Sequence, residues 1–163
     1  MTIRGIKKED NSTIKKIIQD SLESLGLAIP GTAYFDPQLN DLFQYYNNLK
    51  NANYWVVEIA GEVVGGIGIA PLNKHNKICE LQKFYLSSKT HGLGYGKKLM
   101  ETALSFASKH YEKCYLETMH DLKAACILYE KFEFKLLHEP LPGTDHSTMN
   151  TWYLKELKKP FIF

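Results

Sequence analysis

The stretch Thr90–Met100, THGLGYGKKLM, carries three glycines at alternate positions, followed by two lysines and an apolar, helix-like run. Backbone N–H groups at the start of a helix attract anions, and glycines let a phosphate approach because no Cβ intervenes. The P-loop pattern is not met, because a second lysine stands where Ser or Thr is needed, and the dinucleotide pattern GxGxxG is not met either. The glycines alone are equally typical of a tight turn, so their surroundings must decide.

A strand is expected before the glycines and a helix after them. Residues 79–86, CELQKFYL, have strand-like composition, and apolar residues recur at helical spacing over residues 95–109. Residues 114–118, CYLET, then predict another strand. This order forms a βαβ unit, which is normally right-handed, and we expect a ligand at its loop.

The remaining elements predict a mixed α/β layout without repeats. Further strands are expected at residues 2–6, 53–60, 63–71, 134–139 and 150–157, and further helices from Asp10 to about Gly26, at 38–49 and at 124–132. The order is therefore β-α-α-β-β-β-α-β-α-β-β. A chain of 163 residues with 44% hydrophobic residues fits one domain, residues 1–163.

Composition excludes several classes of function. The formal net charge of +2 is too small to predict nucleic-acid or membrane binding. Cys79, Cys114 and Cys126 show neither a disulfide pattern nor the ligand spacing of a zinc site, so no metal is expected. The N-terminus lacks a signal-peptide core, and no apolar run approaches the ~20 residues that span a bilayer. We therefore expect a cytoplasmic protein.

Two segments, LQKFYLSSKTHGLGYGKKLMETAL and YLETMHDLKAACILYEKFEFK, together resemble the GNAT superfamily of acyl-CoA-dependent N-acyltransferases. The resemblance covers residues 3–157 in element order and is most specific over residues 80–135. The superfamily's first motif, Arg or Gln, two residues, Gly, one residue, Gly or Ala, maps onto His91, Gly94 and Gly96. Its second motif maps onto Ala125, Leu128, Tyr129, Glu130, Lys131 and Glu133-Phe134.

Three residues depart from the superfamily pattern. His91 replaces the usual Arg or Gln, Leu122 replaces a common Asn, and Glu133 replaces Gly. The resemblance implies a GNAT-like α/β fold, with a central, mostly antiparallel sheet of six to seven strands and helices on both faces. Because main-chain amides bind the phosphates in such a loop, the departure at His91 leaves that role intact.

The resemblance implies acetyl-CoA as the cosubstrate. Its pyrophosphate would lie on the amides of residues 92–97, and its pantetheine arm would pair with the backbone of residues 84–86 like an added strand. The expected cofactor-binding residues are Phe84, Tyr85, Leu86, His91, Gly92, Leu93, Gly94, Tyr95, Gly96 and Lys97.

Two residues are candidates for catalysis. By resemblance Tyr129 is the general acid for the departing thiolate, and the alternative is that it only packs on the apolar face of its helix. A lysine-like amine is neutral only about one time in 10³ at pH 7, so a general base is expected. Glu80 is the candidate base, acting directly or through water, and the alternative is an exposed strand carboxylate.

The acceptor is expected to be an amine of a small molecule, ahead of a peptide or protein amine. Tyr34, Asp36 and His146 are the candidates for lining its pocket, but Asp36 could instead cap a helix and His146 could be a plain loop residue. Residues 150–157 could form an edge strand used in a homodimer. The alternative function is a non-catalytic module that binds acyl-CoA as a sensor or for interaction.

Overall fold

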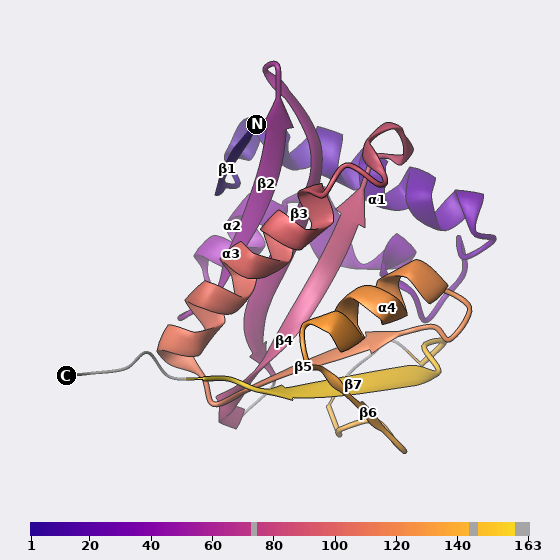
Figure 1. Ribbon diagram of the computed structural model, residues 1–163. Coiled ribbons are helices and arrows are strands. Elements are labelled where there is room, and N and C mark those ends of the chain that lie inside the picture. Colours follow the sequence, from indigo (N-terminus) through magenta and orange to yellow (C-terminus); the bar gives the residue numbers. More distant parts are fainter. Residues whose placement is uncertain (73–74, 144–146, 159–163) are drawn as a thin grey trace.

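Seven strands form one sheet in the computed structural model, which describes residues 1–72, 75–143 and 147–158 (Figure 1). The strands are β1 (Thr2–Gly5), β2 (Asn53–Ile59), β3 (Glu62–Leu72), β4 (His75–Leu86), β5 (Lys113–Thr118), β6 (Lys135–Leu137) and β7 (Thr151–Glu156). The α-helices are α1 (Asn11–Ser24), α2 (Leu42–Asn47), α3 (Tyr95–His110) and α4 (Lys123–Lys131). The element order predicted from the sequence is confirmed.

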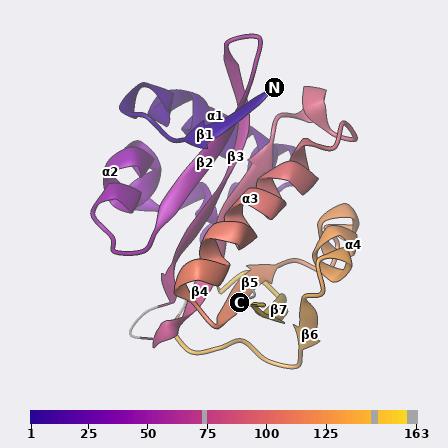
Figure 2. The same cartoon turned by 60° about the vertical axis from the view of Figure 1, so that its left-hand side comes forward.

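The strands lie in the order β1-β2-β3-β4-β5-β7-β6. All neighbours are antiparallel except β4 and β5, which are parallel and are joined through α3. Helices cover both faces of the sheet, with α1 and α2 on one side and α3 and α4 on the other (Figure 2). The predicted fold class is therefore confirmed.

Each helix buries an apolar stripe against its face of the sheet. On α1 the stripe is Ile14, Ile18 and Leu22, which pack with residues such as Tyr54 and Val56 of β2. The stripe of α3 packs on the opposite face and consists of Leu99, Met100, Ala103, Leu104 and Ala107. These stripes follow the 3.6-residue period that the sequence shows. Among the described residues, no helix is long and apolar enough to cross a membrane.

Three predicted elements differ from the structure. The helix expected at residues 38–49 is split into a 3-10 helix, Pro37–Asn40, and α2, because the Asp41 side chain accepts a hydrogen bond from the Gln44 N–H (3.0 Å) and starts a new helix. Strand β4 begins at His75 instead of residue 79. The strand at residues 150–157 is not an edge: β7 lies between β5 and β6, so this proposed dimerisation edge was wrong.

Candidate active site

The sheet opens between its two parallel strands. In the described part of the chain, β4 and β5 pair at Ile78–Lys113, Cys79–Cys114 and Glu80–Tyr115, and then diverge (Figure 1). Beyond this fork β5 continues to pair with β7, whereas β4 pairs with β3. The edge of β4 that faces the fork is therefore available for an added strand.

A bulge at Lys83 sets the direction of the side chains along this edge. Lys83 has φ 49°, and the β3–β4 register shifts between Gly66 and Gly68. A left-handed backbone costs a non-glycine residue about 1–2 kcal/mol. The Tyr54 hydroxyl, which donates to the Lys83 carbonyl at 2.7 Å in a buried position, helps to hold this conformation.

After the bulge, Phe84 and Leu86 pack against the α3/α4 core, whereas Tyr85 packs on the α1/α2 side. The Ser87 N–H donates to the Val64 carbonyl at 2.7 Å. Because backbone groups alternate in an antiparallel pair, the N–H and C=O of Leu86 point away from β3, towards the fork, and those of Tyr85 point towards β3. Nε2 of His91 lies 3.1 Å from the Leu86 carbonyl.

The glycine turn follows directly. Gly92 and Gly94 have φ 78° and 84°, so both need the left-handed freedom of glycine. The first bond within α3 runs from the Lys98 N–H to the Gly94 carbonyl (3.3 Å), so the amides of residues 95–97 precede it and have no acceptor in the helix.

Gly96 has a different role from the other two glycines. A Cβ there would lie 3.3 Å from the Phe84 ring and 3.4 Å from Leu86. The third glycine therefore lets the start of α3 pack closely on β4. As a result, the helix N-terminus lies beside the open edge of the strand.

Tyr129 lies on α4 and faces this region. It is 6% exposed, and its ring centroid is 6.5 Å from that of Phe84 and 5.9 Å from that of Tyr153. Burial raises the pKa of Tyr129 well above its ordinary value, so the phenol is protonated at neutral pH. Its hydroxyl has no hydrogen-bond partner among the described residues. Buried Tyr hydroxyls usually have one, so this donor is available for a ligand.

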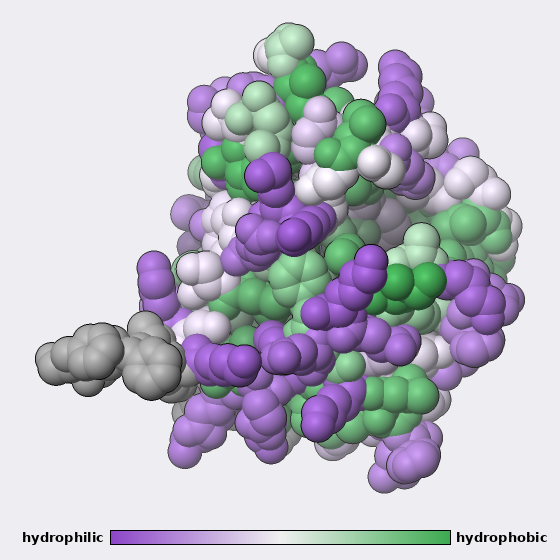
Figure 3. Space-filling model, in the orientation of Figure 1, coloured by the Kyte–Doolittle hydropathy of each residue, from purple (hydrophilic) through white to green (hydrophobic). Residues whose placement is uncertain are grey.

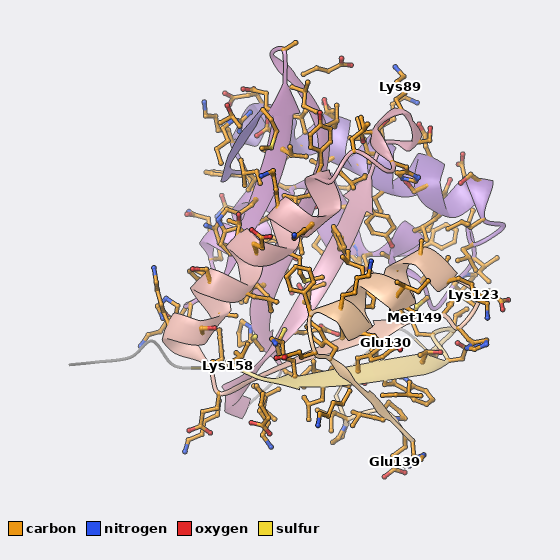
Figure 4. All side chains as sticks on the ribbon, viewed as in Figure 1. Lys89, Lys123, Glu130, Glu139, Met149 and Lys158 are labelled. Carbon is orange, nitrogen blue, oxygen red and sulfur yellow. The ribbon has the colours of Figure 1, made fainter. Side chains whose placement is uncertain are left out.

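Apolar side chains gather between α3 and α4 on this face, with hydrophilic side chains around them (Figure 3). The exposed or half-buried apolar residues of this region are Phe84, Leu86, Leu93, Tyr95, Ile127 and Leu128. Lys89 projects from the turn after β4 and Lys123 from the start of α4, while Glu130 points from α4 towards β7 (Figure 4). The Tyr153 hydroxyl donates to Glu130 at 3.0 Å.

Glu80 lies at the last paired position before the fork. It is only 9% exposed, so the interpretation as an exposed carboxylate was wrong. Gln82 donates through Nε2 to Oε1 of Glu80 at 2.7 Å, and the Tyr46 hydroxyl donates to the side-chain amide oxygen Oε1 of Gln82 at 2.8 Å. A buried carboxylate held in a hydrogen-bonded chain is suited to accept a proton.

Two of the predicted acceptor residues, Tyr34 and Asp36, lie on the α1/α2 side, in residues 30–41, which we name the acceptor loop. The Tyr34 hydroxyl donates to Glu23 at 2.5 Å. Asp36 precedes the 3-10 helix Pro37–Asn40, but its side chain does not cap it: Oδ2 accepts from Nζ of Lys83 at 2.9 Å. His146 lies outside the described residues.

The start of the acceptor loop contacts the segment before β7. Thr148 donates to the Pro30 carbonyl through Oγ1 (2.7 Å) and to the Gly31 carbonyl through its N–H (3.2 Å). Gly31 has φ 82°, and a Cβ there would lie 2.2 Å from Thr148 Oγ1, so only glycine fits.

Lys83, Gln82 and Tyr54 were not identified from the sequence. The signal for Gln82 and Lys83 was that two consecutive polar residues break the two-residue alternation of the strand, as an extra, bulged residue would.

Sequence comparisons identify the family. A family model described as "Acetyltransferase (GNAT) family" matches residues 18–134. A protein of Escherichia coli (strain K12), called uncharacterized N-acetyltransferase YjgM, is 40% identical over 158 residues, which cover 95% of this chain and 94% of that protein. The N-acetylaspartate synthetase of Xenopus tropicalis is 32% identical over 122 residues, which cover 72% of this chain but 45% of that protein.

Solved structures share the fold. An acetyltransferase of the GNAT family from Staphylococcus aureus Mu50 has a TM-score of 0.80 at 19% identity, covering 96% of this chain and 99% of that one. The yncA protein of Salmonella typhimurium, solved with its cofactor acetyl-CoA, has a TM-score of 0.77 at 18% identity, covering 99% of this chain and 96% of that one. With the family match over residues 18–134, these findings show that the chain belongs to the acetyltransferase (GNAT) family and is an acetyl-CoA-dependent acyltransferase.

Proposed function

We propose that this chain transfers the acetyl group of acetyl-CoA directly to an amine of a small molecule. The observation that carries the proposal is Tyr129, a buried, protonated phenol beside the fork whose hydroxyl has no partner among the described residues. A group of this kind can donate a proton to a leaving thiolate.

The residues at the fork fit acetyl-CoA. The backbone of Phe84 and Leu86 faces the open edge of β4 and suits an added, strand-like arm. The amides of residues 92–97, at the start of α3, suit a pyrophosphate. His91, Leu93 and Tyr95 would lie at the rim of that site. Acetyl-CoA, when bound, supplies an activated acetyl thioester.

Glu80 would take the proton from the acceptor amine, directly or through a water molecule. For an amine with pKa near 10.4, deprotonation at pH 7 costs roughly 4–5 kcal/mol. The carboxylate of Glu80 is buried and held by Gln82, which keeps it oriented. Tyr129 approaches the fork from the α4 side and Glu80 lies on the α1/α2 side, so acid and base come from opposite faces of the sheet.

The acceptor would bind between the acceptor loop and the segment before β7, lined by Tyr34, Asp36 and His146. The contacts of Thr148 with Pro30 and Gly31 support a pocket formed by both segments. The name of one relative, N-acetylaspartate synthetase, supports a small acceptor ahead of a peptide.

The test is release of thiol from acetyl-CoA across a panel of small amines, combined with thermal melts with CoA. An enzyme gives acceptor-dependent thiol release together with stabilisation by CoA. Stabilisation without thiol release for any amine or peptide would instead support the binding module.

Glu80→Gln tests the base. Turnover with an amine found in that panel should fall about 100-fold at pH 7, and the loss should narrow as rising pH deprotonates the amine in solution. Glu62→Gln, at an exposed position at the start of β3, is the matched control. A loss that is independent of pH would contradict the role of Glu80 as a base.

A further inference from the structure

Resting on the proposed function, we infer that the ion pair between Lys83 and Asp36 couples the cofactor strand to the acceptor loop, so that binding of acetyl-CoA orders the loop. Lys83 and Asp36 are then positioning residues. The Nζ–Oδ2 distance is 2.9 Å, and the side chains are 2% and 15% exposed. The pair joins residues that are 47 positions apart in the chain.

The burial of Lys83 needs a reason other than stability. Desolvation of a buried ion pair often exceeds its Coulombic gain, so that apolar replacements of both partners are commonly neutral or stabilising. A buried lysine also has long, directional reach, which an apolar side chain lacks. The role of the ion pair is therefore to position the acceptor loop relative to β4.

The bulge that carries Lys83 is supported by residues of α2, β2 and β3. The Tyr54 hydroxyl holds the Lys83 carbonyl at 2.7 Å. A Cβ at Gly66 would lie 2.3 Å from the Tyr54 ring, and a Cβ at Gly68 would lie 2.5 Å from the Tyr46 hydroxyl. The two glycines thus make room for the tyrosines behind the bulge.

Lys83 directly precedes Phe84, the first proposed contact of the pantetheine arm. A partner that pairs with the backbone of Phe84 fixes the peptide plane that it shares with Lys83. This restricts the φ and ψ angles of Lys83, and it therefore also restricts where the ammonium group that holds Asp36 can lie. The effect of the cofactor therefore reaches the acceptor loop through one residue.

Other residues of the acceptor loop are held by hydrogen bonds that do not involve the ion pair. Gln19 of α1 donates to the Tyr34 carbonyl at 3.1 Å, and Thr148 donates to Pro30 at 2.7 Å. These bonds do not involve β4. The ion pair therefore links this loop, which α1, the segment before β7 and the packing of Leu39 in the core on the α1/α2 side also hold, to the strand that would bind acetyl-CoA.

Hydrogen exchange with and without acetyl-CoA tests this coupling and needs no acceptor. In the wild type, acetyl-CoA should slow exchange about fivefold or more both at residues 84–97 and at residues 30–41. In the double variant Lys83→Met/Asp36→Leu the protection at 84–97 should remain, whereas that at 30–41 should be lost. Lys16→Met/Asp20→Asn removes an exposed pair of α1 and should behave as the wild type.

The outcomes separate the two proposals. Protection at residues 84–97 without a change at 30–41 in the wild type, or an equal change at 30–41 in the double variant, would overturn the coupling and leave the cofactor site standing. No protection at 84–97 would overturn the proposed cofactor site and the coupling with it. If the double variant melts below the assay temperature, Asp36→Asn, which keeps the shape and removes the charge, takes its place with the same expectations.

Discussion

At the open edge of β4 and in the glycine turn, the groups proposed to hold acetyl-CoA belong to the backbone of Phe84, Leu86 and residues 92–97. The acceptor loop is instead held by side chains, through the pairs Tyr34–Glu23 and Asp36–Lys83. A backbone site accepts many residue types provided that the glycines remain, whereas a site held by side chains changes with each substitution. We therefore expect single substitutions to change the proposed acceptor pocket more readily than the proposed cofactor site.

Tyr129→Phe should have the largest effect. Removing the phenolic hydroxyl should lower kcat about 100-fold or more and leave the KM for acetyl-CoA within a few-fold, because the groups proposed to hold the cofactor belong to the backbone. The measurement is steady-state thiol release. Tyr153→Phe is the matched control: its hydroxyl is bonded to Glu130 and its ring packs 5.9 Å from that of Tyr129. Equal losses in both variants would contradict the role of acid.

Gly94→Val should weaken acetyl-CoA binding about tenfold or more, since each 1.4 kcal/mol is a factor of about ten. Gly94 has φ 84°, which a β-branched residue adopts only with strain, and the new side chain would stand beside the amides of α3. Calorimetric titration measures the affinity. Gly61→Val provides the control, because it places the same strain (φ 80°) in the β2–β3 turn. Similar affinity for acetyl-CoA in both variants would show that the glycine stretch is an ordinary turn and not a binding site.

Asp10→Asn should destabilise the protein in a pH-dependent way. Burial alone would raise the pKa of Asp10, but the Arg4 guanidinium (2.8 and 3.1 Å) and the Lys7 N–H (2.8 Å) hold it below its ordinary value. The stabilisation is therefore present above about pH 4 and is lost as pH falls through the lowered pKa. At pH 7 the variant should lose about 1–3 kcal/mol of unfolding free energy.

Urea unfolding at pH 7, 5 and 3 measures this loss, which should shrink towards pH 3. Asp20→Asn, in the exposed pair with Lys16, should cost less than about 1 kcal/mol at every pH. A loss in Asp10→Asn that stays constant with pH would show that the hydrogen bonds act without the charge.

His91→Ala should have the smallest effect, below about 0.5 kcal/mol in acetyl-CoA binding. His91 is exposed, and among the described residues the hydrogen-bond partner of its ring is the Leu86 carbonyl. The same titration applies. A loss as large as that of Gly94→Val would mean that a side chain, and not the backbone, dominates the phosphate site.

The elements that form the proposed cofactor site were largely predictable from the sequence. Residues 79–86, the glycine turn and the helix after it are contiguous, so their periodicity and their glycines specify the strand, the turn and the helix N-terminus locally. The helical spacing of Ala125, Leu128 and Tyr129 likewise predicted α4.

The contacts of the acceptor loop were not predictable in the same way. Its contacts join residues far apart in the chain: Asp36 with Lys83, and Pro30 with Thr148. Such pairs depend on the packing of the whole sheet, which no local pattern encodes. The place of β7 inside the sheet was missed for the same reason, since strand order is a tertiary property.

The short parallel pairing of β4 with β5, which we call the seam of the sheet, carries two neighbouring thiols. Cys79 and Cys114 are paired in register, and both are 0% exposed. Burial raises the pKa of the Cys114 thiol, and the Cys79 thiol donates to the Lys113 carbonyl at 3.5 Å. Both are therefore inert to labelling reagents while the seam is closed. Their alkylation rate is a built-in reporter of how often the two halves of the sheet separate, readable without adding a probe to the protein.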